Sequence, residues 1–213
     1  MDFADAVAAI EAALGRGLPG ATAHGLMAPR PRRQWPDGFN LAGIRHAAAL
    51  LLLVREDDGS AAVVLTVRAN ALGRHSGQVS MPGGVIEPGE ATADASLREA
   101  HEEIGLDVTG VRVLGALTAL DIPVSGFRLH PIVASLDHRP RFEPAPDEVA
   151  RVLEVPLEWL LDPTQVAWRS SGLDERRFEF PCFPFDGAEI WGATAMALAE
   201  FLALLEWRGP RYT

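Results

Sequence analysis

This sequence of 213 residues contains one cysteine and no lysine. Its single cysteine, Cys182, excludes internal disulfides and any metal site built from several thiolates. All 19 basic residues are arginines, and 29 acidic residues outweigh them to give a net charge of −10 at pH 7. An acidic chain without a basic cluster is a poor general partner for nucleic acid or anionic membranes, so we expect neither as a partner. The short run of Arg30, Arg32 and Arg33 is the one local exception.

Long hydrophobic runs are missing as well. The most apolar stretch, residues 47–54, is far shorter than the roughly 20 residues that a membrane helix needs, and it predicts a fully buried strand. The N-terminus carries Asp2, Asp5 and Glu11 with no early basic residue, which is the wrong flank for a signal peptide. Together with the single cysteine, this favours a cytoplasmic location.

The residues that are present suit a soluble globular protein, since 48% are hydrophobic and 23% are charged. The spacing of apolar residues predicts helices at 2–14, 91–104, 156–161 and 194–207, and strands at 47–54, 61–68, 111–118, 130–136, 149–155 and 178–183. Residues 19–39 predict an irregular arm rich in proline and arginine, and residues 69–90 predict a long loop. We therefore expect an α/β layered fold in a single domain, with an N-terminal helix and arm over residues 1–40 and the main domain over 41–213.

Three carboxylates share one face of the predicted helix at 91–104. Glu99, Glu102 and Glu103 stand at positions i, i+3 and i+4 and so fall within one arc of about 100°. The opposite face is apolar, with Ala93, Leu97, Ala100 and Ile104. Like charges at these spacings repel one another, and a hard divalent cation such as Mg²⁺ or Mn²⁺ would offset the repulsion with oxygen ligands. A solvated acidic face is the alternative for this pattern alone.

The residues on either side of this helix favour a cation site over a solvated acidic face. Gly83 and Gly84 open a loop whose backbone is free to approach a ligand closely. Glu90 and Arg98 are spaced to pair across the junction of loop and helix, and Gly105 ends the helix just after the carboxylates. From residue 84 to residue 106 the pattern G-x5-E-x7-R-E-U-x-E-E-x-G-U, with U aliphatic, resembles the Nudix box at every fixed position.

The resemblance implies a Nudix hydrolase, which is an α/β/α sandwich with a mixed sheet that cleaves a nucleoside diphosphate linked to another moiety. It implies a Mg²⁺ or Mn²⁺ site with Glu99 and Glu103 as principal ligands, Glu102 as a further ligand and the carbonyl of Gly83 as another. By the same resemblance, structural support of the site comes from Gly84, Glu90, Arg98 and Gly105.

Hydrolysis of a diphosphate also needs a base that takes a proton from the attacking water. Glu99 is one candidate. Nudix enzymes also draw the base from a loop outside the box, and the best candidate there is Glu148, just before a predicted strand. The alternative for Glu148 is an exposed carboxylate in a turn.

The segment before the box narrows the substrate. Residues 64–84 resemble the motif L-L-T-x-R-[S/A]-x3-R-x3-G-x3-F-P-G-G of coenzyme A pyrophosphatases. The agreeing positions are Leu65, Thr66, Arg68, Ala69, Gly77, Pro82, Gly83 and Gly84. Gly73 stands where the second arginine of the motif belongs, and Arg74 follows it directly. The resemblance to this subfamily runs from about residue 45 to about residue 206.

This second resemblance implies that coenzyme A and water give 4′-phosphopantetheine and adenosine 3′,5′-bisphosphate. Arginine suits bidentate contacts with phosphate, so Arg68 and Arg74 are candidate substrate-binding residues, with a structural ion pair as the alternative for Arg68. His75 is a further candidate that either reaches phosphate or caps the loop. Apolar residues around 178–191 are candidates for the pantetheine end of the site.

Two other functions stay open at this point. A Nudix pyrophosphatase for another nucleoside diphosphate derivative, such as ADP-ribose, is compatible with the departure at Gly73. A Nudix-fold binding module without turnover is the second alternative, although the intact carboxylates of Glu99, Glu102 and Glu103 speak against it. The oligomeric state is open, and a homodimer is compatible with the sequence.

Overall fold

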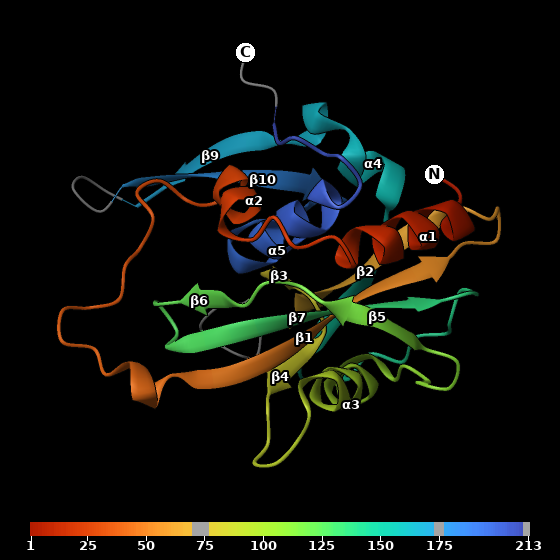
Figure 1. Cartoon of the computed structure of the whole chain (residues 1–213), viewed down its shortest axis with the longest axis horizontal. Helices are drawn as coiled ribbons and strands as arrows, with labels where there is room; N and C mark the ends of the chain where they lie inside the picture. The colour runs from red at the N-terminus through yellow and green to blue at the C-terminus, as the bar shows by residue number, and fades with distance from the viewer. Residues whose placement is uncertain (70–76, 173–176, 211–213) are drawn as a thin grey trace.

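A large mixed sheet forms the centre of the molecule (Figure 1), whose computed structural model describes residues 1–69, 77–172 and 177–210. Its strands are β1 (Arg45–Arg55), β2 (Ala61–Arg68), β3 (Val79–Ser80), β4 (Gly83–Val85), β5 (Arg112–Ala116), β6 (Leu120–Ile122), β7 (Phe127–Leu136) and β8 (Val149–Pro156). The order is β3-β2-β1-β7-β5, with β4 beside β1, β6 beside β7 and β8 beside β2. Because β1 and β7 run parallel and the other pairs are antiparallel, the predicted mixed sheet is confirmed.

Helices cover both faces of this sheet. The helices are α1 (Phe3–Leu14), α2 (Ala21–Leu26), α3 (Thr92–Ile104), α4 (Leu157–Leu161) and α5 (Gly192–Ala203), with short 3-10 turns at Leu41–Gly43 and Pro163–Gln165. In Figure 1, α3 lies below the sheet, whereas α1, α2 and α5 lie above it. A second sheet of β9 (Ala167–Ser171), β10 (Phe178–Phe185) and β11 (Ala188–Ile190) lies on the side of α5. The predicted α/β/α sandwich is therefore confirmed. None of the helices in the described residues is long and apolar enough to cross a membrane.

The strand β1 explains why the sequence has an uninterrupted apolar run. Successive side chains of a strand point to opposite faces, so a strand covered on both faces must be apolar at every position. Leu50 and Leu52 face α3 and share a core with Ile104. Leu51 and Leu53 face the other way and share a core with α1 and α5. Strand β1 thus packs against helices on both faces of the sheet. Its N-terminal half pairs with β4, which belongs to the loop of the candidate site.

The structure differs from the sequence prediction mainly in short elements. Residues 69–90 were predicted as one long loop, but their described part contains β3 and β4. Strands of two or three residues are too short to show an alternating pattern, and both are held by backbone pairing to β2 and β1. For the same reason β6 and β11 were missed, and the five-residue β9 was missed because its sequence AWRSS has no alternating apolar pattern. The last helix, α5, ends at Ala203, four residues earlier than predicted.

The arm at 19–39 was predicted to be irregular, and this is wrong for the six residues of α2. A buried carboxylate on α5 holds this segment in place. Glu200 accepts hydrogen bonds from the Gly20 N–H (3.0 Å), the Thr118 N–H (3.1 Å) and the Thr118 hydroxyl (2.6 Å), and it contacts His24 Nε2 at 2.7 Å. Glu200 is 0% exposed. Since these partners lie far apart in the sequence, no local pattern reveals the helix.

Candidate active site

The helix α3 is built to present carboxylates on one side. Its apolar side is buried, since Ala100 and Ile104 are fully enclosed in the core beneath β1. The helix ends at Gly105, which takes a left-handed conformation with φ +63° and donates its N–H to the His101 carbonyl at 2.9 Å. With one face buried and the C-terminal end fixed, the helix leaves Glu102 exposed at the surface and Glu99 partly buried beside it.

An ion pair joins the loop to this helix, as the spacing of Glu90 and Arg98 predicts. The Arg98 guanidinium donates from Nε to Glu90 Oε1 at 2.8 Å and from Nη2 to Glu90 Oε2 at 3.0 Å. Nη2 also donates to the Val85 carbonyl at 3.1 Å. The hydrogen bonds from Arg98 lower the pKa of Glu90 to about 2, so this carboxylate stays charged in ordinary buffers. Arg98 and Glu90 thus fix the loop after β4 against α3.

Arg98 also contacts two of the predicted metal ligands. Its Nη1 donates to Glu99 Oε1 at 2.8 Å and to Glu102 Oε2 at 3.2 Å. The guanidinium therefore offsets part of the repulsion that the sequence assigned to a cation alone. In this arrangement, no group of three or more His, Cys, Asp or Glu side chains in the described residues converges as a ready metal site. Binding of a cation by Glu99 and Glu102 would require both carboxylates to turn away from Arg98.

The third carboxylate of the box points inward. Glu103 is only 7% exposed and accepts a hydrogen bond from the Gly83 N–H at 3.1 Å. Burial, together with the negative charges of Glu99 and Glu148, raises its pKa to about 7, although the Gly83 N–H and Arg68 act to lower it. Because the charges of Arg68, Glu99 and Glu148 all act on Glu103, these three side chains lie near it.

The structure thus brings together residues from four segments that the sequence singled out. Arg68 ends β2, Glu99 and Glu103 belong to α3, Gly83 begins β4, and Glu148 precedes β8. The Ala69 N–H donates to the Glu148 carbonyl at 2.9 Å, which fixes the start of β8 beside the end of β2. The side chain of Glu148 is exposed, so both interpretations of this residue stay open.

Two predicted substrate-binding residues, Arg74 and His75, lie outside the described residues, as does Gly73. Their predicted roles stay predictions. Glu102 is at the outer edge of the cluster, with a side chain that is 57% exposed. It lies on the solvent side of Arg98, whereas Glu103 lies on the inner side of the helix.

The donor set fits a hard divalent cation. The negatively charged side chains near Glu103 are the carboxylates of Glu99 and Glu148. Mg²⁺ and Mn²⁺ prefer such oxygen ligands. The buried carboxylate of Glu103 lies near Arg68 but also near the carboxylates of Glu99 and Glu148, so this group of side chains needs more positive charge. A divalent cation at Glu99 and Glu103, with Glu102 as a further ligand, would supply that charge.

Gly84 leaves room for one of these carboxylates. A Cβ atom at this position would overlap the carboxylate of Glu99, which is the mobile end of a flexible side chain. We expect Gly84→Ala to displace Glu99 and lower the hydrolysis rate by about a hundredfold, the scale on which small misplacements of reacting groups act. The fold should survive, so the midpoint of thermal unfolding should change by only a few degrees.

Gly83→Ala is the matched comparison for this prediction. A Cβ atom on Gly83 would overlap the Ala48 carbonyl and Ala49 in the backbone of β1, and these atoms cannot move aside. This variant should unfold at a clearly lower temperature, whereas Gly84→Ala should not. Full activity of a folded Gly84→Ala protein would contradict the placement of Glu99 over the loop.

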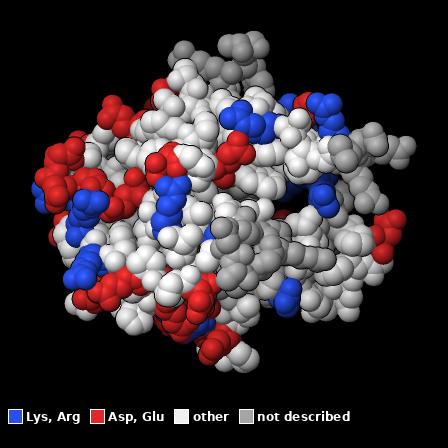
Figure 2. All heavy atoms as spheres, turned by 180° about the vertical axis from the view of Figure 1, so that it is seen from behind, with Lys and Arg blue, Asp and Glu red and all other residues white. Residues whose placement is uncertain are grey.

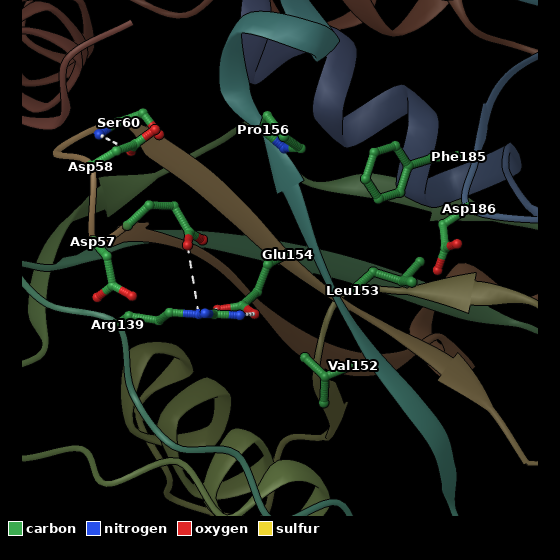
Figure 3. Close-up of a pocket in the computed structure, with 11 residues that line it drawn as sticks. Asp57, Asp58, Ser60, Arg139, Val152, Leu153, Glu154, Pro156, Phe185 and Asp186 are labelled. Carbon is green, nitrogen blue, oxygen red and sulfur yellow. Dashed lines mark hydrogen bonds and ion pairs between the residues drawn. The ribbon is translucent and has the colours of Figure 1, made fainter.

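Two cavities lie near the ends of the sheet, and they differ in charge. The larger, of about 630 Å³, lies at the turn between β1 and β2 (Figure 3). Its labelled lining residues include Asp57, Asp58, Glu154 and Asp186, and Arg139 donates to Glu154 from Nε and Nη2 at 2.9 and 2.6 Å. This cavity lies at the far end of β2 from Arg68 and contains none of the predicted catalytic residues. Its acidic lining is a poor match for a diphosphate.

The second cavity, of about 500 Å³, lies between the arm, β6 and the start of α5. Its lining is apolar and basic, and it includes Arg32, Arg33, Phe178 and Trp191. From behind, basic spheres lie beside a hollow on the right side of the molecule (Figure 2). The sequence flagged both parts, since Arg30, Arg32 and Arg33 were the local basic exception and residues 178–191 were candidates for one end of the site. Only the fold shows that they face each other.

The class of protein follows from this arrangement together with a family comparison. A loop and helix with the box of carboxylates, set on a mixed sheet inside an α/β/α sandwich, define a Nudix fold. Residues 44–175 match the NUDIX domain. The chain therefore belongs to the Nudix family, and it is a Nudix hydrolase of the pyrophosphatase type.

Individual relatives agree with this assignment. The chain is 34% identical over 164 residues to a Yersinia enterocolitica protein named Uncharacterized Nudix hydrolase NudL, covering 75% of this chain and 80% of the relative. It is 34% identical over 176 residues to the chloroplastic Nudix hydrolase 22 of Arabidopsis thaliana, covering 79% of this chain and 58% of that one. Among solved structures, the M. smegmatis Nudix hydrolase RenU aligns with a TM-score of 0.53 at 19% identity, covering 84% of this chain and 91% of that chain, which supports the fold alone.

Proposed function

We propose that the chain hydrolyses the diphosphate bond of coenzyme A or its derivatives, giving 4′-phosphopantetheine and adenosine 3′,5′-bisphosphate. The position of Arg68 carries this proposal. Arg68 belongs to the segment at 64–84 that resembles coenzyme A pyrophosphatases, and it acts electrostatically on Glu103 in the box. An arginine at this point can hold a phosphate group beside the carboxylates, because its planar guanidinium bonds two phosphate oxygens at once.

Each residue of the cluster has a task in this reaction. Water attacks one phosphorus, the bridging P–O bond breaks, and the proton from water passes to a carboxylate. Glu99 and Glu148 are the candidates for that carboxylate, because both lie around Glu103. The hydrogen bond from the Gly83 N–H holds Glu103 in place, while Glu90 and Arg98 hold the loop against α3.

Nudix hydrolases generally use divalent metal ions, and we propose Mg²⁺ or Mn²⁺ at Glu99, Glu102, Glu103 and the Gly83 carbonyl. When bound, such an ion neutralises and orients the phosphate oxygens and makes water a stronger acid. In the absence of the ion Glu99 and Glu102 bind Arg98, and both carboxylates would have to turn away from Arg98 to bind the ion.

The test is a comparison of specificity constants. Purified protein with excess Mg²⁺ is assayed separately on coenzyme A and on ADP-ribose, and kcat/KM is measured for each. We expect coenzyme A to exceed ADP-ribose by at least about tenfold, which corresponds to roughly 1.4 kcal/mol of differential binding. A higher kcat/KM for ADP-ribose would keep the Nudix assignment but replace the proposed substrate. No turnover of either compound with Mg²⁺ or Mn²⁺ would contradict the proposal.

A further inference from the structure

The cavity of about 500 Å³ lies at the same end of the sheet as the catalytic cluster. The cavity lies on the α5 side of the sheet and α3 lies on the other face, so strand pairing gives the separation between them along the sheet. Gly84 pairs with Ala48 of β1, Ala48 pairs with His130 of β7, and the neighbouring Leu129 pairs with Leu120 of β6, which lines the cavity. Three strand spacings separate Gly84 from Leu120, about 14 Å in all. A substrate with a bulky group beyond its diphosphate can reach this far.

The other wall of the cavity is tied to the strands of the active site. Gly192, Ala193 and Met196 of α5 line it, and the Thr194 hydroxyl between them donates to the Val79 carbonyl at 3.0 Å. Val79 belongs to β3, which pairs with β2 next to Arg68. This wall of the cavity is therefore attached to β3, the neighbour of the strand β2 that carries the proposed phosphate-binding arginine.

The lining combines an aromatic wall with two cations. Phe178 and Trp191 are half-buried, with ring centroids 6.2 Å apart, and Phe180 packs behind Trp191 at 4.6 Å. The Arg33 guanidinium lies 5.9 Å from the Phe178 ring centroid. Aromatic rings and guanidinium planes are the surfaces on which nucleic acid bases stack. The wall suits a planar base.

Arg32 and Arg33 differ from the seven arginines that form ion pairs with carboxylates in the described part of the chain. Within the described ranges, neither forms an ion pair with a carboxylate, and both side chains are exposed at the cavity. The nearby Asp121, which also lines the cavity, interacts electrostatically with Arg32, but its carboxylate is shared, because it accepts two hydrogen bonds from Arg128, at 2.6 and 3.1 Å, and one from Trp35 Nε1 at 3.3 Å. By contrast, ion pairs with carboxylates are formed by Arg98, Arg112, Arg128, Arg139, Arg141, Arg151 and Arg169.

We propose that this cavity binds a purine nucleoside carrying a phosphomonoester, and that Arg32 and Arg33 determine specificity by holding that phosphate. In coenzyme A this group is the adenosine 3′-phosphate, so the inference rests on the proposed function. The neutral pantetheine half would supply no counter-charge to either guanidinium group. ADP-ribose has no phosphomonoester and would gain nothing from them.

The test compares coenzyme A with 3′-dephospho-coenzyme A, which differ in that one phosphate. In the wild type we expect kcat/KM for coenzyme A to be about tenfold to a hundredfold higher, the range of one or two charge-assisted hydrogen bonds. The double variant Arg32→Gln/Arg33→Gln should lose this preference through a raised KM for coenzyme A, with dephospho-coenzyme A unaffected. The matched control is Arg16→Gln/Arg55→Gln, which removes the same charge at exposed positions outside the cavity lining.

Binding to the full chain without turnover separates this inference from the proposed function. Calorimetry with adenosine 3′,5′-bisphosphate and with AMP should show tighter binding of the bisphosphate to the wild type, and that advantage should vanish in the double variant. If coenzyme A is hydrolysed but the double variant keeps its preference, the cavity assignment is wrong and the proposed function stands. If coenzyme A is not hydrolysed, equal binding of both nucleotides, or no binding, overturns the cavity assignment as well.

Discussion

Glu99→Gln is expected to lower the rate of diphosphate hydrolysis by about 10³-fold, within the usual range for losing a catalytic carboxylate. Glutamine keeps the shape of the side chain over Gly84 but removes the negative charge. Both predicted roles of Glu99, as a cation ligand and as a base, need that charge. The measurement is kcat at saturating substrate and Mg²⁺, together with the thermal unfolding midpoint to verify the fold.

Asp94→Asn is the matched control, because Asp94 is an exposed carboxylate on the same helix, outside the contacts that join α3 to the loop. It should retain activity within about twofold. A Glu99→Gln protein that keeps more than a third of the wild-type rate would contradict the assignment of Glu99 to the active site. Glu148→Gln separates the two candidate bases, since the variant of the true base loses the acidic limb of the pH–rate profile while KM stays unchanged.

Glu200→Ala should destabilise the fold by about 3–5 kcal/mol, the usual cost of removing one partner from a buried ion pair. The substitution would leave the N–H groups of Gly20 and Thr118, the Thr118 hydroxyl and His24 without their common acceptor. For a chain of this size the thermal midpoint should fall by about 10 °C. The matched control is Glu11→Ala, which removes an exposed pair with Arg112 and should cost less than about 1 kcal/mol.

The contribution of Glu200 to the free energy of unfolding should also depend on pH. Burial acts to raise the pKa of Glu200, but the hydrogen bonds with His24, Thr118 and Gly20 outweigh it and hold the pKa below the ordinary value of 4.5. A carboxylate with a lowered pKa stabilises the fold above the unfolded-state pKa, and this stabilisation is lost as pH falls through the folded-state pKa. The difference in unfolding free energy between wild type and Glu200→Ala should therefore narrow below about pH 4.5. A difference that stays constant down to pH 3 would show that the charge of Glu200 contributes nothing.

The sequence predicted the main elements of the sandwich because they depend on local patterns. Strand β1 is apolar throughout because both of its faces are buried, and α3 is apolar on one side because only that side is buried. The pairing of Glu90 with Arg98 was predictable as well, since eight residues separate them across one turn into a helix. The box positions therefore predicted the helix and its end at Gly105, but they did not predict that Glu103 turns inward while Glu102 stays exposed.

The remaining features depend on contacts between distant segments. The bonds of Arg98 to Glu99 and Glu102 compete with the role of these residues as cation ligands, and spacing alone cannot show which bonds form. The helix α2 depends on Glu200, which is 176 residues from His24. Similarly, Arg33 meets Phe178 only because the arm crosses the end of the second sheet, where Arg30 forms a bridge with Glu179.

Product analysis of coenzyme A hydrolysis in ¹⁸O-labelled water tests the central claim most directly. With Mg²⁺ present, the account predicts 4′-phosphopantetheine and adenosine 3′,5′-bisphosphate as products, with one ¹⁸O atom in one of the two. It also predicts that EDTA stops the reaction and that added Mg²⁺ restores it. Release of inorganic phosphate with the diphosphate bond intact, or turnover that continues in excess EDTA, would contradict it.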